Sequence, residues 1–303
     1  MVKGAMNMWK KIIEVNPPYD FDELLDRSSL DPLHKVDVNN RMMQVPLYDE
    51  EGNPFVATVQ AIGTTEAPQF VVSGQNESQQ SRALIELERI FQWNHSLQEV
   101  YDHFKQTNLA ALFQQQAGTP FMLDFHLYDC LMKCIIHQQL NLSFAFQLSS
   151  SFAQTFGFEI DGVWFYPRPE DVAKLSYEDL RKMKFSQRKA EYVIDTSRLI
   201  ASGELPLDEL PNMSDDEVMK TLVKVRGIGP WTVQNVLMFG LGRPNLFPVA
   251  DIGLQNAIKR YFDLEEKPSK EEMVQYSKEW SPYQSYASLY LWRSIEKKRR
   301  ETT

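Results

Sequence analysis

A glycine-containing turn between two expected helices is the segment whose residue types most directly suggest chemistry. In residues 214–240, two sets of apolar residues at helical spacing flank the run Val225-Arg226-Gly227-Ile228-Gly229-Pro230. Glycine permits torsions and close approaches that a Cβ obstructs, and Pro230 suits the first position of a helix. Such a turn exposes backbone N–H groups at the positive end of a helix, where a phosphate can bind. The same glycines could instead serve helix packing alone, and Ile228 suits packing better than contact with a nucleic acid.

A single carboxylate downstream of the turn is the second candidate. Asp251 lies 22 residues after Gly229, at the end of an apolar run and at the start of an expected helix. An aspartate at this position can cap the helix by accepting hydrogen bonds from its first amides. A helix N-terminus also favours an ionised carboxylate, which can stabilise a developing cation or activate a water. Capping and catalysis are therefore compatible roles for Asp251.

The elements that must position these residues show two kinds of sequence pattern, one typical of strands and one typical of helices. Before residue 80, short segments rich in Val, Phe and Thr are bounded by turn-forming residues, which is typical of antiparallel strands. From residue 81 onward the apolar spacing is helical, and residues 120–303 are interpreted as a succession of helices. We predict an α+β fold with an N-terminal β-rich domain at 1–80 and a helical region at 81–303.

Composition limits the class of protein. The 303 residues are 43% hydrophobic and 24% charged, which is ordinary for a globular chain. The two cysteines, Cys130 and Cys134, exclude a disulfide framework and a four-cysteine metal site, and with His137 they supply only three ligands. We expect them on an apolar helix face. No run approaches about 18 apolar residues, so we expect a cytoplasmic location, nucleoid-associated in a bacterium, and no membrane contact.

The net charge of −9 is unevenly distributed. Residues 1–110 contain 9 basic and 16 acidic residues, which leaves 23 basic and 25 acidic residues in 111–303. Residues 181–198 alone hold six Lys and Arg against two Asp and Glu. The overall acidity excludes non-specific coating of nucleic acid, but it is compatible with a local phosphate-binding face.

Together, the turn and Asp251 give the chain a family resemblance. The segments VRGIGPWTVQ and VADIGL resemble the hairpin and the catalytic-aspartate segment of the helix-hairpin-helix DNA glycosylases. The chain is most similar to the alkylation-repair branch, 3-methyladenine DNA glycosylase II, and further segments agree in order: NPPYDFDELL, CIIHQQLNLSFAFQL and SYASLYLWRS. The resemblance implies a β domain and a two-lobed helical region with the active cleft between its lobes. One lobe would hold central helices at about 120–247, with the hairpin at 214–240, and the other would combine about 81–119 with 248–303.

The resemblance also implies a site. Asp251 would be catalytic, and Trp231 and Trp292 would provide aromatic walls for a base that alkylation has made electron-poor. Without the family, both tryptophans would be interpreted as core residues. Bifunctional relatives have a lysine just after the turn, where this chain has Trp231, so we expect a monofunctional enzyme. Asn235 and Ile252 stand where the best-known members have aromatic residues, which predicts a less aromatic or differently selective pocket.

The implied DNA contacts lie on two segments. Gln138 and Gln139 would enter the minor groove and fill the gap left by an extruded nucleotide, although both could simply solvate a helix end. The hairpin would grip phosphates, which gives these expected DNA-binding residues: Gln138, Gln139, Arg226, Gly227, Ile228, Gly229 and Thr232. Backbone carbonyls of Val225 and Gly227 would hold a structural monovalent cation, and no other cofactor is expected.

The function implied by the resemblance is hydrolytic excision of alkylated purines such as 3-methyladenine from duplex DNA. The enzyme would flip the damaged nucleotide out of the helix, act in base excision repair and work as a monomer. Two alternatives stay open at this point. The chain could be a non-catalytic helix-hairpin-helix DNA-binding module, or a glycosylase for oxidised or deaminated bases.

Overall fold

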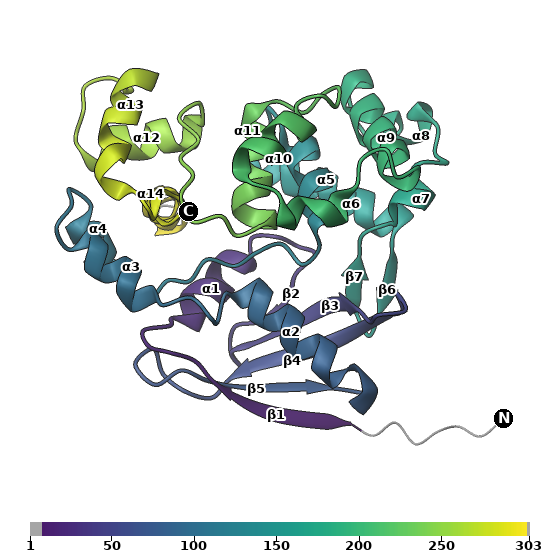
Figure 1. The fold of residues 1–303 in the computed structure, drawn as a ribbon, viewed down its shortest axis with the longest axis horizontal. Coiled ribbons are helices and arrows are strands. Elements are labelled where there is room, and N and C mark those ends of the chain that lie inside the picture. The colour runs from purple at the N-terminus through teal and green to yellow at the C-terminus, as the bar shows by residue number, and fades with distance from the viewer. Residues whose placement is uncertain (1–7, 302–303) are drawn as a thin grey trace.

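A five-stranded antiparallel sheet forms the N-terminal part of the molecule (Figure 1). The computed structural model describes the backbone of residues 8–301 and the side chains of residues 8–296. The strand order is β1-β5-β4-β3-β2, and the strands are β1 (Trp9–Glu14), β2 (Lys35–Asp37), β3 (Met42–Tyr48), β4 (Pro54–Ala61) and β5 (Gln69–Gly74). Alternate residues of β4 are buried, because one face of the sheet packs on helices.

Two helices cover that buried face. They are α1 (Phe21–Ser28) and α2 (Gln80–Phe91), which follows a 3-10 turn, η1 (Glu77–Gln79). The ring of Phe21 packs against Phe70 of β5 and Phe91 of α2, with ring centroids 5.1 Å and 5.8 Å apart. These contacts bring α1 to the middle of the molecule, beside the helical region.

The helical region forms two groups above the sheet (Figure 1). One contains α5 (Leu127–His137), α6 (Leu142–Phe156), α7 (Pro169–Val172), α8 (Tyr177–Arg181), α9 (Gln187–Ala201), η2 (Leu207–Asn212), α10 (Asp215–Leu222), α11 (Pro230–Asn235) and the π-helical turn η3 (Val236–Gly240). The other contains α3 (Leu97–Phe104), α4 (Ala110–Gln115), α12 (Ile252–Tyr261), α13 (Lys270–Ser277), η4 (Lys278–Trp280) and α14 (Gln284–Glu301). The predicted α+β fold class is confirmed.

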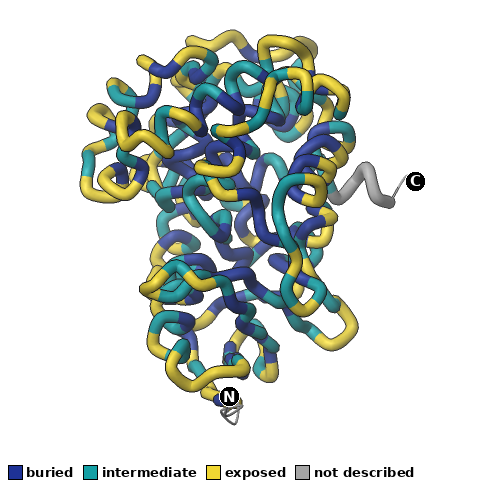
Figure 2. Tube along the Cα trace, turned by 90° about the vertical axis from the view of Figure 1, so that its right-hand side faces the viewer, coloured by how far each residue is buried: buried dark blue, intermediate teal, exposed yellow. Residues whose placement is uncertain are grey.

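The buried hydrophobic residues form two clusters, and Figure 2 shows how deeply each part of the backbone is buried. One part runs from the sheet through α2–α4 to α12–α14, where the rings of Phe113 and Tyr290 stack with centroids 4.0 Å apart. The other part lies within α5–α11 and includes the buried thiols of Cys130 and Cys134. Because the sheet shares its core with α12–α14, the division of the chain at residue 80 stays a prediction.

A short β-hairpin inside the helical region corrects the interpretation of residues 120–303 as helices only. Strands β6 (Phe158–Ile160) and β7 (Val163–Phe165) pair around Asp161 and Gly162, which both have positive φ angles, 52° and 78°. An Asp-Gly pair favours the two-residue turn of a hairpin. The strands are too short to show a clear alternation, so the helical patterns around them dominate. Among the described residues, every helix is too short or too polar to span a bilayer.

Candidate functional site

The carboxylate of Asp251 is held by three N–H groups from three different elements. Its Oδ1 accepts a hydrogen bond of 2.8 Å from the amide of Leu254, so it caps α12 as predicted. The indole Nε1 of Trp231 donates to Oδ2 and that of Trp292 donates to Oδ1, both at 3.0 Å. Asp251 and both tryptophans line one cavity of about 430 Å³. The two predicted aromatic walls therefore also fix the orientation of the carboxylate.

Gly253 is a residue of this site that the sequence reasoning missed. A Cβ at this position would lie 2.9 Å from Oδ1 of Asp251 and 3.1 Å from Nε1 of Trp292. A side chain would therefore push the indole away from the carboxylate. The signal was present in the sequence, because the glycine stands in the first turn of a helix, where it weakens the helix unless close approach requires it.

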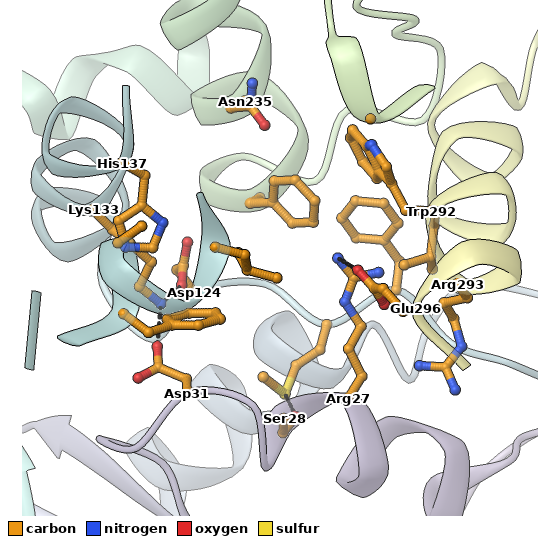
Figure 3. A pocket seen from close by; sticks show the side chains of 18 of the residues that line it. Arg27, Ser28, Asp31, Asp124, Lys133, His137, Asn235, Trp292, Arg293 and Glu296 are labelled. Carbon is orange, nitrogen blue, oxygen red and sulfur yellow. Dashed lines mark hydrogen bonds and ion pairs between the residues drawn. The ribbon is translucent and has the colours of Figure 1, made fainter. Parts of the chain in front are cut away.

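A group of polar residues, Asp31, Asp124, Lys133 and His137, lines the side of the cavity away from Trp292 (Figure 3). The ammonium of Lys133, on α5, lies 2.6 Å from Asp124 Oδ1 and 3.1 Å from Asp31 Oδ2. Burial disfavours its charge, but the two carboxylates outweigh burial and raise the pKa of Lys133 well above its usual value. Burial also lowers the pKa of His137, a turn further along α5, to about 4, so this imidazole is neutral near pH 7.

No local spacing in the sequence indicates this polar wall. Asp31 follows α1, whereas Lys133 belongs to a helix that begins almost a hundred residues later. Only the packing of α1 against the helical region brings them together. Neither residue could therefore be predicted as part of the site.

The predicted hairpin consists of α10, a turn and α11. Ser214 and Glu217 form a capping box at the start of α10. Gly227 has a φ of +92°, and a Cβ there would lie 2.2 Å from Cγ of Tyr192, so glycine is required at this position. A Cβ at Gly229 would meet no atom within 4 Å. Gly229 therefore leaves the outer face of the turn open.

The expected DNA-contacting residues of the hairpin differ in exposure. Ile228 and Thr232 are buried, with 4% and 1% of their surface exposed, so their side chains pack inside the protein. Any contact that these two make with DNA must come from their backbone atoms. The side chain of Arg226 is 66% exposed and pairs with Glu191 at 2.6 Å.

Gln138 and Gln139 follow α5 directly but differ in their contacts. The amide Nε2 of Gln138 donates to the carbonyl of Gly227 at 2.9 Å and to Oγ1 of Thr232 at 2.8 Å. Gln138 therefore braces the hairpin rather than projecting into solvent. Gln139 is exposed and has a φ of 57°, a left-handed backbone conformation that bends the chain sharply.

Lys189, at the start of α9, fixes the same loop and was missed by the sequence analysis. Its ammonium donates to the carbonyl of Ile136 and, at 2.9 Å, to that of Gln138. These are carbonyls at the C-terminal end of α5, where a cation is favourable. Partial burial lowers the pKa of Lys189 to about 8. Lys189 and Gln138 thus tie the loop that carries Gln139 to both α9 and the hairpin.

Comparison with known proteins gives the family. Residues 132–282, which contain the hairpin and Asp251, match the HhH-GPD superfamily of base excision DNA repair proteins. The chain is 60% identical over 289 residues to YfjP of Bacillus subtilis, a protein named provisionally as a DNA-3-methyladenine glycosylase, and the match covers 95% of this chain and 100% of YfjP. The chain belongs to the HhH-GPD superfamily. The predicted resemblance to helix-hairpin-helix glycosylases is therefore confirmed.

Two further relatives support this membership. A DNA-3-methyladenine glycosylase of Bacillus subtilis is 40% identical over 173 residues, which cover 56% of this chain and 57% of that protein. The solved structure of a 3-methyladenine DNA-glycosylase from Archaeoglobus fulgidus has the same fold as this HhH-GPD chain, with a TM-score of 0.82 at 22% identity. That likeness covers 94% of this chain and 97% of the archaeal one, so the N-terminal sheet is part of the shared fold.

Proposed function

We propose that this HhH-GPD protein is a monofunctional DNA glycosylase that excises alkylated purines such as 3-methyladenine from duplex DNA by hydrolysis. The observation that carries the proposal is the carboxylate of Asp251, held by Trp231 and Trp292 at the wall of a cavity of about 430 Å³. The printed names of the relatives, DNA-3-methyladenine glycosylases, support alkylated purines as the substrate class.

The chemistry follows from the charge that develops on the sugar. Alkylation of a ring nitrogen makes the base a good leaving group, and loss of the base leaves a cationic sugar. A fixed carboxylate stabilises that cation without having to reorganise during the reaction. Asp251 would do this electrostatically and could also take a proton from the attacking water.

The hairpin and the loop after α5 would hold the DNA. The open face of Gly229 leaves room for a phosphate to approach the backbone of the turn. Gln139, exposed at a sharp bend, would fill the gap left by the extruded nucleotide, and extrusion itself costs a few kcal/mol. Gln138 would act as a brace for the hairpin. We propose that the enzyme binds damaged duplex DNA as a monomer.

Lys133 lines the cavity, yet the geometry favours hydrolysis over lyase chemistry. A lysine that attacks C1′ must lose its proton, but Lys133 is paired with Asp124 and Asp31, which stabilise the ammonium. The position just after the turn holds Trp231 and therefore offers no amine.

A monovalent cation at the hairpin remains part of the proposal. The carbonyl oxygens of Val225 and Gly227 are the candidate ligands, and each already accepts one hydrogen bond, from Ile228 N and Gln138 Nε2. A carbonyl has two lone pairs, so each oxygen can still face a cation. Such an ion would support the turn beside a phosphate and would take no part in the reaction.

The proposal is tested by incubating the enzyme with methylated duplex DNA and with duplexes that contain 8-oxoguanine or uracil. We expect release of methylated bases alone, and strand breaks only after treatment with alkali. Borohydride should trap no covalent enzyme–DNA complex. Release of 8-oxoguanine or uracil would favour another lesion class, and binding without base release would favour a non-catalytic module.

A further inference from the structure

The guanidinium of Arg27 reaches the cavity from α1, in the N-terminal part of the chain (Figure 3). Its Nη2 lies 3.9 Å from Oε1 of Glu296, at the outer limit of an ion pair, and the two side chains are 28% and 23% exposed. Its Nη1 is buried and has no hydrogen-bond partner among the described residues. A buried donor without a partner is costly, and a small shift of this partly exposed guanidinium would bring it to an acceptor that enters the cavity.

A neighbouring arginine shows what a structural ion pair looks like here. Arg293, the residue after Trp292, is 2% exposed and pairs closely with Glu23 of α1. That pair joins α1 to α14 firmly. The looser and more exposed pair of Arg27 and Glu296 is not needed for the same purpose.

The position of Glu296 on α14 places this ion pair on the same side of the cavity as Asp251, at a separation that a bound base could span. Trp292 and Glu296 are four residues apart on α14, so they lie on one face of the helix, about 6 Å apart along its axis. The indole of Trp292 bonds to Asp251. A base whose glycosidic bond lies beside Asp251 would therefore extend its far edge toward Arg27 and Glu296.

The chemistry of the pair fits guanine better than adenine. A guanidinium offers coplanar donors and a carboxylate offers acceptors. Guanine presents the acceptor O6 beside the donors N1–H and the 2-amino group, whereas adenine presents an amino donor where guanine has O6. Methylation at N7 makes N1–H more acidic, which strengthens its hydrogen bond to a carboxylate.

We propose that Arg27 and Glu296 recognise the flipped base and favour N7-alkylated guanine. With this pair, the rate of 7-methylguanine release relative to that of 3-methyladenine is higher than it would be in the same enzyme without the pair. Arg27 donates to O6, and Glu296 accepts from N1–H and the 2-amino group. This proposal rests on the proposed glycosylase function. It assigns base discrimination to two residues, Arg27 and Glu296, that both lie outside the region 132–282 that the family model matches.

The test measures both bases released from one methylated duplex by chromatography. We expect Arg27→Met to lower the rate of 7-methylguanine release relative to 3-methyladenine by roughly tenfold, the size expected for the loss of one charge-assisted hydrogen bond to O6. The isosteric Glu296→Gln should lower the ratio less, because it keeps an acceptor. Arg82→Met, which removes a surface arginine of α2 paired with Glu86, should leave the ratio unchanged.

The ratio is insensitive to partial unfolding, because unfolding lowers both rates equally. A ratio within twofold of wild type for both Arg27→Met and Glu296→Gln would overturn the assignment. Release of 3-methyladenine without 7-methylguanine by the wild-type enzyme would overturn it as well. If the wild type released neither base, the proposed function itself would fail instead.

Discussion

Replacing Gln138 or Gln139 by alanine should separate bracing of the hairpin from insertion into DNA. Nε2 of Gln138 donates two hydrogen bonds, to Gly227 O and Thr232 Oγ1. Each such bond contributes about 1 kcal/mol net, so Gln138→Ala should lower the free energy of unfolding by about 2 kcal/mol. Gln139 is exposed, and alanine occupies the same left-handed backbone conformation at similar cost, so Gln139→Ala should change stability by less than about 0.5 kcal/mol.

In excision the order should reverse, and Gln139→Ala should affect the single-turnover rate more than Gln138→Ala does. Gln139→Ala should lower the single-turnover rate of base release, because nothing would fill the gap in the helix. Gln138→Ala should mainly weaken DNA binding through a less ordered turn. Urea denaturation and single-turnover excision on methylated duplex DNA measure both quantities. If Gln138→Ala kept full stability and lost excision, Gln138 would be the inserted residue and the bracing role would be wrong.

Three further perturbations test the cavity and the hairpin. Lys133→Met should lower the free energy of unfolding at pH 7 by about 3–5 kcal/mol, because it leaves two buried carboxylates unpaired. Urea denaturation measures this loss, and adding Asp31→Asn should recover part of it. A loss under about 1 kcal/mol would contradict the burial of this ion-pair cluster. Burial lowers the pKa of His137 in the cavity wall, and that of His126 at the N-cap of the same helix, α5, to about 4, below the unfolded value of about 6.5. These neutral imidazoles contribute fully to stability above about pH 6.5. Between pH 6.5 and pH 4 the free energy of unfolding should fall by up to about 1.4 kcal/mol per pH unit for each histidine. If His137→Asn left the slope of the free energy of unfolding against pH unchanged, the contribution assigned to His137 would be wrong. Gly227→Ala should weaken duplex binding at least tenfold in a fluorescence titration, because its Cβ would enter a tyrosine ring; wild-type affinity would show that the turn tolerates a side chain.

The sequence was sufficient where the signal is local. The hairpin could be predicted because a capping box, two apolar stripes and a Gly-x-Gly-Pro turn lie within 27 residues, 214–240. Asp251 could be predicted as a helix cap for the same reason. The placing of Trp231 and Trp292 in the same site needed the family resemblance, and their hydrogen bonds to Asp251 were not predicted, since α11, α12 and α14 are far apart in the chain.

The rest depends on packing between distant segments. Arg27 and Asp31 reach the cavity because α1 packs beside the helical region, and no periodicity near residue 30 indicates that contact. Gln138 looked like an exposed helix-end residue, and its role as a brace depends on the position of Gly227, 89 residues later. The β6–β7 hairpin was overlooked because three-residue strands are too short for a period-two pattern to stand out.

The catalytic role proposed for Asp251 is tested most directly by Asp251→Asn, assayed for base release and for duplex binding in parallel. Asparagine keeps the size of the side chain and can still cap α12, but it has no negative charge to stabilise the sugar cation. We expect single-turnover excision to fall at least a hundredfold, while affinity for a duplex with an abasic-site analogue stays within about threefold of wild type. An exposed carboxylate of η2 outside the cavity, Asp208, serves as the control as Asp208→Asn. Near-normal release of 3-methyladenine by Asp251→Asn would contradict the account.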